Sequence, residues 1–134
     1  MSNRERADIA NKSNADVFLR IHTDGSINKK EKGFSILTTS AKNPYISKNV
    51  YKKSLVISNE IIQKIEKNKK VEDIKGIIYR DDLSGANWSK VPGTLIELGY
   101  MTNREEDKKL ADSRYLKSIT NSIADGIDQY LKKK

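Results

Sequence analysis

The sequence predicts an α/β domain with a mostly parallel central sheet flanked by helices. Short apolar segments with the twofold period of strands alternate with longer segments that have helical period. Apolar residues make up 36% of the chain and are gathered in these segments, which is typical of a globular domain. A length of 134 residues suits one core, so we expect residues 1–134 to form a single domain.

Four segments have the character of strands, bounded by glycine, proline or turn-forming residues. In the first, Val17, Leu19 and Ile21 share one face, and His22 lies on the other with the polar residues. The last is a compact apolar strand that contains one carboxylate, Glu97. The predicted strands are 15–22, 33–39, 77–79 and 93–99.

Helices are predicted from capping boxes and from apolar residues at helical spacing. The predicted helices are 2–14, 45–66, a short helix that begins with the capping box at 102–105, and a final helix after 112–113. The apolar face of the final helix should contain Leu116, Ile119, Ile123, Ile127 and Leu131. Residues 67–75 and 81–91 should be connections.

Composition excludes several kinds of protein. The chain has no cysteine, which excludes disulfides and thiolate metal sites. No apolar run is long enough to span a membrane. The net charge of +8 favours an anionic partner, but the basic residues are scattered and form no stripe interleaved with aromatic residues. We therefore expect no nucleic-acid interface and no membrane span.

Two residues are candidates for chemistry. His22 is the only histidine and ends a predicted strand, where open α/β sheets place their ligands. A lone histidine is nevertheless more often structural than a metal ligand. Glu97 lies within an apolar strand, where desolvation would raise the pKa of its carboxyl group and suit it to general acid–base catalysis. The alternative for Glu97 is an inward charge that protects a sheet edge.

The chain resembles the zinc-dependent N-acetylmuramoyl-L-alanine amidases, which cleave the bond between muramic acid and L-alanine in peptidoglycan. The segment 15–25, Ala-Asp-Val-Phe-Leu-Arg-Ile-His-Thr-Asp-Gly, is similar to the family's "Ala-Asp-Leu-Phe-Ile-Ser-Ile-His-Ala-Asn" strand. Residues 92–103 resemble "Pro-x-x-Leu-x-Glu-x-Gly-Phe-x-x-Asn". The helix at 6–11, the glycine-led strand at 33–37 and the last helix fit other family motifs. The segment 80–88 is most similar to clostridial wall hydrolases and the spore-cortex amidase.

This resemblance implies a peptidoglycan substrate and a zinc ion held by two histidines and a glutamate. It implies that His22 is one zinc ligand and that Glu97 is the catalytic general base. Arg80, Asn87 and Trp88, which precede the Glu97 strand, are the candidate substrate-binding residues. Trp88 could stack on a sugar or peptide, or simply anchor its loop to the core.

The family pattern opens with "Asp-x-Gly-His-Gly-Gly" and a helix that carries the ligand glutamate, and the 134 residues contain neither. We therefore expect the chain to correspond to the carboxy-terminal part of the catalytic domain, and its hydrolytic activity alone to be doubtful. An open sheet edge should then favour homo-oligomers. The expected location is the cell wall, outside the cell. A non-catalytic wall-binding module that retains the fold is the alternative function, and a basic nucleic-acid-associated protein is a third.

Overall fold

A computed structural model describes all residues, 1–134, as a four-stranded sheet with five helices. The order along the chain is α1 (Asn3–Lys12), β1 (Phe18–Asp24), β2 (Phe34–Thr38), α2 (Lys48–Glu66), β3 (Ile74–Tyr79), α3 (Ser84–Trp88), β4 (Gly93–Tyr100), α4 (Arg104–Leu110) and α5 (Ser113–Lys132). Every predicted strand is present, and the α/β class is confirmed.

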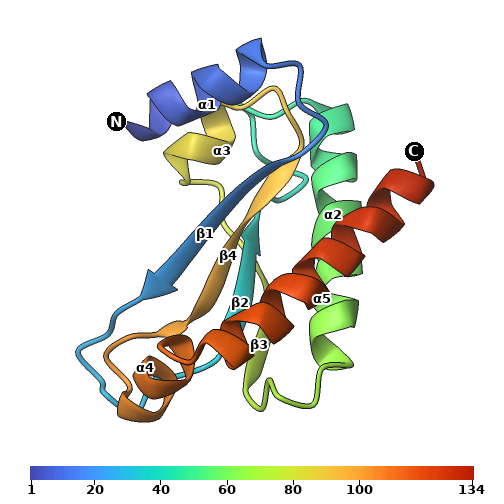
Figure 1. The fold of residues 1–134 in the computed structure, drawn as a ribbon. Helices are drawn as coiled ribbons and strands as arrows, with labels where there is room; N and C mark the ends of the chain where they lie inside the picture. Colours follow the sequence, from blue (N-terminus) through green and yellow to red (C-terminus); the bar gives the residue numbers. More distant parts are fainter.

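The sheet is mixed, with the spatial order β1-β4-β2-β3. β1 pairs with β4 in parallel and β2 pairs with β3 in parallel, whereas the central pair β2 and β4 is antiparallel. The predicted sheet was mostly parallel, and the difference comes from the connection between β3 and β4. That connection holds only the short α3 and stays at one end of the sheet, so β4 must run back in the opposite direction (Figure 1).

Helices α2 and α5 lie side by side across one face of the sheet and enclose the core (Figure 1). β-branched residues dominate this core, as suits strands and helices that bury one face. Its members come from both central strands and both helices and include Phe34, Ile36, Ile57, Ile61, Ile65, Ile96, Ile119, Ile123 and Tyr130. The apolar face predicted for the last helix is therefore correct except at its end, where Tyr130 is buried and Leu131 is exposed.

The helix starts follow the capping chemistry of the sequence. Ser2 and Glu5 form the predicted capping box at α1. At α4 the cap is Asn103, one residue later than predicted, because its side chain accepts a hydrogen bond from the amide of Glu106. Helix α3 lies inside the predicted loop 81–91. It has only five residues and no side-chain cap, so the sequence carries little signal for it.

The ends of the sheet are covered by different helices, and α1 and α3 pack together at one end while α4 lies at the other (Figure 1). β1 is an edge strand, since it pairs only with β4. Ile21 of β1 and Ile9 of α1 are both more than half exposed beside this edge. Homo-oligomer formation through the edge stays a prediction. No helix in the structure combines the length and the apolar character needed to cross a bilayer.

The contact between α2 and α5 depends on a glycine. A Cβ atom at Gly126 would lie 2.6 Å from the Cα of Ile61, which is closer than real Cβ contacts allow. The two helix backbones can therefore approach closely only because residue 126 has no side chain.

We expect Gly126→Ala to lower the free energy of unfolding by roughly 1 to 2 kcal/mol, because overpacking outweighs the better helix propensity of alanine. Chemical denaturation followed by circular dichroism would measure the change. Asp125→Ala, at an exposed neighbouring position in α5, is the control and should change stability by less than about 0.5 kcal/mol. A Gly126→Ala protein as stable as the parent would show that the helices can separate without loss.

Candidate functional site

The register of β1 and β4 places His22 opposite Glu97 in the sheet. Residues that face each other across paired strands project from the same side, so both side chains lie on the face opposite the α2–α5 core. Nδ1 of His22 is 3.8 Å from Oε1 of Glu97. The pairing becomes irregular between His22 and Asp24, and such irregularities often redirect side chains beside active sites.

Glu97 is a carboxyl group in an apolar setting, and only 7% of the residue is exposed. Its Oε2 atom is buried and has no hydrogen-bond partner. Burial raises the pKa of Glu97 to about 7, and the nearby negative charge of Asp24 adds to the rise. A carboxyl group with this pKa exchanges its proton readily at neutral pH, which is the property that a general acid–base catalyst needs.

His22 is more exposed than Glu97, with 42% of its side chain accessible. Burial, together with the positive charges of Arg20 and Arg6, lowers the pKa of His22, so its imidazole is neutral at pH 7. Nη2 of Arg20 lies 3.2 Å from Nε2 of His22. A guanidinium can only donate, so Nε2 accepts this hydrogen bond and the ring proton is on Nδ1, toward Glu97.

The residues of this chain do not by themselves form a zinc site. Catalytic zinc is generally held by three protein ligands, with water or substrate in the open position. The 134 residues contain no group of three His, Cys, Asp or Glu side chains arranged to hold a metal. His22 is the single imidazole, and its Nε2 lone pair is engaged by Arg20.

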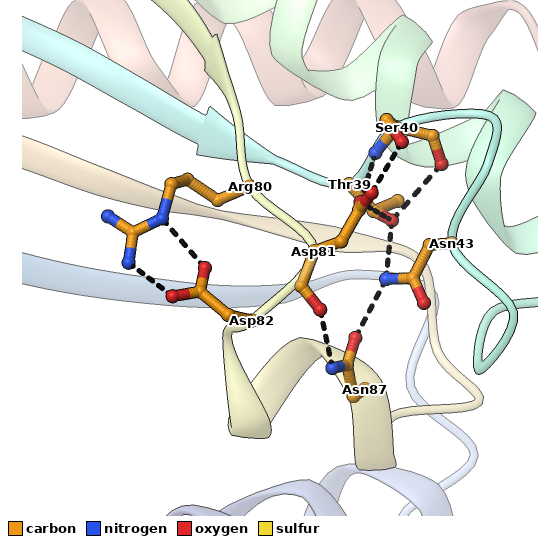
Figure 2. Close-up of polar contacts among 7 residues, drawn as sticks. All are labelled: Thr39, Ser40, Asn43, Arg80, Asp81, Asp82 and Asn87. Atoms are coloured by element: carbon orange, nitrogen blue, oxygen red, sulfur yellow. Dashed lines mark hydrogen bonds and ion pairs between the residues drawn. The ribbon is translucent and has the colours of Figure 1, made fainter.

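The segment from Arg80 to Asn87 is held by internal polar contacts (Figure 2). Arg80 forms two hydrogen bonds of 2.7 Å with Asp82. The side chain of Asn87 donates to the carbonyl of Asp81 at 2.8 Å and accepts from Asn43 at 2.8 Å. Both side-chain polar atoms of Asn87 are thus hydrogen-bonded, and the bond to Asn43 links α3 to the connection between β2 and α2.

Asp81 completes this network by holding the residues that follow β2. Its carboxylate accepts from the amide of Ser40 at 2.8 Å and from the Ser40 hydroxyl at 2.6 Å (Figure 2). These hydrogen bonds lower the pKa of Asp81. The network therefore positions α3, whose residue Gly85 contacts Arg20 on the same face as His22.

Trp88 lies at the end of α3, and 49% of it is exposed. The guanidinium of Arg4 is 4.3 Å from the centre of its ring. The carbonyl of Trp88 accepts a hydrogen bond from Asn11 of α1. The structure thus brings His22 and Glu97 together. It places Arg80, Asn87 and Trp88 in the connection between β3 and β4, where each of them makes other contacts. That these three residues bind substrate stays a prediction.

Sequence reasoning missed two residues that act on the His22–Glu97 pair. Arg20 precedes His22 by two positions, so the strand period alone places both on one face. The negative charge of Asp24 adds to the rise in the pKa of Glu97 and partly opposes the lowering of the pKa of His22. Asp24 follows His22 by two positions on β1, so the same strand period places it on the His22 face.

A neutral imidazole opposite a desolvated carboxyl group on an accessible sheet face is the kind of arrangement that hydrolases use for general acid–base catalysis. A family model described as N-acetylmuramoyl-L-alanine amidase matches residues 1–129. The chain therefore belongs to the N-acetylmuramoyl-L-alanine amidase family, as the sequence motifs predicted.

Curated relatives agree with the family match. The amidase AmiA of Escherichia coli (strain K12) is 24% identical, over 94% of this chain and 55% of the relative. The germination-specific N-acetylmuramoyl-L-alanine amidase of Bacillus subtilis (strain 168) is 26% identical, over 98% of this chain and 51% of the relative. The chain spans about half the length of the curated relatives it matches.

Solved structures share the fold. The catalytic domain of CwlV from Bacillus (Paenibacillus) polymyxa var. colistinus superposes with a TM-score of 0.83 at 24% identity, covering 100% of this chain and 68% of that domain. CwlD from Clostridioides difficile, solved in complex with the GerS lipoprotein, gives a TM-score of 0.81 at 26% identity, covering 98% and 62%. The mixed sheet with flanking helices is therefore an amidase catalytic fold.

The raised pKa of Glu97 has a consequence for stability. The folded protein retains the Glu97 proton up to about pH 7, whereas the ordinary pKa of a glutamate side chain is 4.5. Between these values the folded state binds more protons than the unfolded chain, so this group makes stability fall as pH rises. Below the lower value the carboxyl is protonated in both states and the effect disappears.

We therefore expect Glu97→Gln to be more stable than the parent by roughly 1 to 3 kcal/mol at pH 8, with the difference shrinking toward pH 5. Urea denaturation across this pH range would measure it. Glu66→Gln, which removes a carboxylate at the exposed end of α2, controls for the loss of one charge. A parent–variant difference that is the same at pH 5 and pH 8 would mean that Glu97 ionises at its ordinary value in the fold.

Proposed function

We propose that this chain supplies part of the active site of a peptidoglycan hydrolase that cleaves the amide bond between N-acetylmuramic acid and L-alanine. The observation that carries the proposal is the desolvated carboxyl group of Glu97 opposite His22, in a chain that belongs to the amidase family. Relatives named for this activity, from Escherichia coli and Bacillus subtilis, support the same substrate.

In this proposal Glu97 transfers protons. The carboxylate form takes a proton from the water that attacks the carbonyl carbon of the muramoyl group. The resulting carboxylic acid then gives the proton to the amine nitrogen of L-alanine as the C–N bond breaks. A pKa of about 7 suits both steps, because neither protonation state is strongly disfavoured at neutral pH. The proton on Nδ1 of His22 points toward Glu97 and helps to orient its carboxyl group.

Zinc is part of the proposal because the resemblance to the amidase family implies it. When bound, zinc would lower the pKa of water and polarise the scissile carbonyl. His22 is the residue of this chain that we propose as a ligand, once its imidazole is released from Arg20. Further ligands are required in addition, because residues 1–134 hold no complete donor set. We also propose the cell wall, outside the cell, as the place of action, because the homologous enzymes are named for wall amide bonds.

The test is made in the longest natural form of the protein that contains these residues, with purified peptidoglycan as substrate. Glu97→Gln retains shape but removes the base, so we expect hydrolysis to fall by roughly two to four orders of magnitude while metal content is unchanged. His22→Ala should reduce metal content and hydrolysis together. The measurements are new amino groups released from the wall and zinc per chain by elemental analysis.

Asp107→Asn, at an exposed position in α4, is the control and should leave both measurements unchanged. A Glu97→Gln protein that hydrolyses peptidoglycan at the parent rate would remove Glu97 from the mechanism. A parent protein that sediments with peptidoglycan but releases no amino groups at any zinc concentration would instead support a non-catalytic wall-binding module.

A further inference from the structure

Glu97 lies where the regular part of the sheet ends. In the antiparallel ladder between β2 and β4, Ser35 opposite Glu97 is the last pair toward the carboxyl end of β4. In the parallel ladder between β1 and β4, the pairing becomes irregular directly after His22 opposite Glu97. Neighbouring strands therefore fix the end of β4 less completely than its middle, and other contacts have to hold the segment that follows the carboxyl group.

The carboxylate of Glu106 makes the contact between β4 and β2 beyond this point. Glu106 belongs to α4, which lies at this end of the sheet (Figure 1), and only 8% of the residue is exposed. Its Oε1 atom accepts a hydrogen bond from the amide of Gly33 at 2.8 Å and another from the amide of Tyr100 at 3.0 Å. One oxygen thus joins the residue before β2 to the last residue of β4. Hydrogen bonds to a carboxylate are strong, and a buried amide without an acceptor is costly.

This contact differs from the usual one for a glutamate in the first turn of a helix. Such a glutamate commonly binds the amide of the N-cap residue, which is Asn103 in α4. Here the amide of Asn103 donates to the carbonyl of Tyr100, and Glu106 binds two residues outside its helix. A Cβ atom at Gly99 would lie 2.8 Å from Oε2 of Glu106, so the carboxylate keeps this position only while residue 99 is glycine.

The segment after β4 is also attached to the segment that follows His22. Three hydrogen bonds make this attachment: the amide of Met101 to the carbonyl of Asp24 at 2.9 Å, the amide of Ser26 to Oγ1 of Thr102 at 3.0 Å, and Nδ2 of Asn103 to the carbonyl of Lys29 at 3.1 Å. Glu106 adds the link to β2, on the side of β4 away from the edge strand β1. The end of β4 is therefore held from both sides, and Glu106 provides the buried link on one of them.

We propose that Glu106 is a positioning residue for Glu97. By binding the amides of Gly33 and Tyr100 on one oxygen, it keeps the end of β4 in place, and with it the Glu97 carboxyl group on the sheet face that carries His22. This inference rests on the proposed function, because the position of Glu97 affects hydrolysis only if Glu97 transfers protons. Glu106 acts through the backbone and takes no part in the chemical step.

The role depends on the length of the side chain and on its acceptor oxygen. Glu106→Gln retains an oxygen at the same reach, whereas Glu106→Asp retains the charge but is too short for both amides, and Glu106→Ala has no acceptor. We expect the Asp and Ala variants to lower kcat by roughly ten- to a hundredfold with KM changed less than about twofold, and Glu106→Gln to lower kcat less than about threefold. The measurement uses the longest natural form of the protein and soluble muramoyl-peptide fragments of peptidoglycan.

A second measurement does not depend on hydrolysis. In the same proteins labelled with ¹⁵N, NMR follows the backbone amide resonances of His22 and Glu97. We expect these resonances to move in Glu106→Asp and Glu106→Ala, because the end of β4 shifts, and to stay near the parent positions in Glu106→Gln. A glutamate that only stabilises α4 would leave them in place in all three variants.

Two control variants separate positioning from general effects. Gly126→Ala lowers stability at the contact between α2 and α5, and it should leave kcat and both resonances unchanged. Glu105→Gln removes the neighbouring carboxylate of α4, whose side chain is 75% exposed, and should also change neither. Thermal melting sets a temperature at which every variant is folded. If Glu106→Ala does not fold, the comparison of Glu106→Asp with Glu106→Gln decides the result.

A parent-like kcat in Glu106→Asp, or resonances of His22 and Glu97 that stay in place in that variant, would overturn the proposal. So would a Glu106→Gln protein as impaired as Glu106→Asp, because charge rather than reach would then be required. An equal fall of kcat in Gly126→Ala would attribute the effect to stability and overturn it as well. Resonances that move as expected, in a protein whose longest form releases no amino groups from peptidoglycan, would leave the positioning of Glu97 standing and reject the proposed hydrolysis.

Discussion

The parallel pairing of β1 with β4 is the constraint on which the rest of the site depends. It sets His22 opposite Glu97, and a slip of one residue would move one of the two side chains to the other face of the sheet. The apolar neighbours of Glu97 keep the register, because Ile96 must face the α2–α5 core if Glu97 is to face away from it. The same residues that stabilise the fold therefore place the carboxyl group.

This arrangement places one destabilising group, the buried carboxyl of Glu97, within a stable fold. A buried carboxyl oxygen without a hydrogen bond destabilises the folded state, and the Glu97 carboxyl responds by retaining its proton to about pH 7. Local strain or unsatisfied groups of this kind are common at functional sites, where the surrounding structure stabilises them. Here the surrounding stability comes from the isoleucine-rich core and the close contact of α2 with α5 at Gly126.

Much of the fold could be predicted from the sequence because its local signals agree with the final structure. The Ser2–Glu5 capping box and the alternation around Leu19 specify their elements without long-range information. The antiparallel pairing of β2 with β4 and the short helix α3 could not be predicted, because both depend on how the 80–92 connection folds back on the sheet. For the site, the residues alone identified His22 and Glu97 separately and the family resemblance assigned both to one active site, while the register that sets them opposite each other comes from the structure. The strand period places Arg20 on the face of His22, but the hydrogen bond of Arg20 to His22 and the effect of Asp24 on the pKa of Glu97 come from the structure.

The central claim is that the fold desolvates Glu97 enough to make it a proton carrier at neutral pH. The most direct test is an NMR titration of the chain with ¹³C-labelled glutamate side chains, in which the Glu97 resonance is assigned by its loss in Glu97→Gln. The structure predicts that this carboxyl titrates with a midpoint near pH 7. A midpoint at the ordinary glutamate pKa of 4.5 would contradict the account, because Glu97 would then be an ordinary ionised carboxylate rather than a general acid–base catalyst.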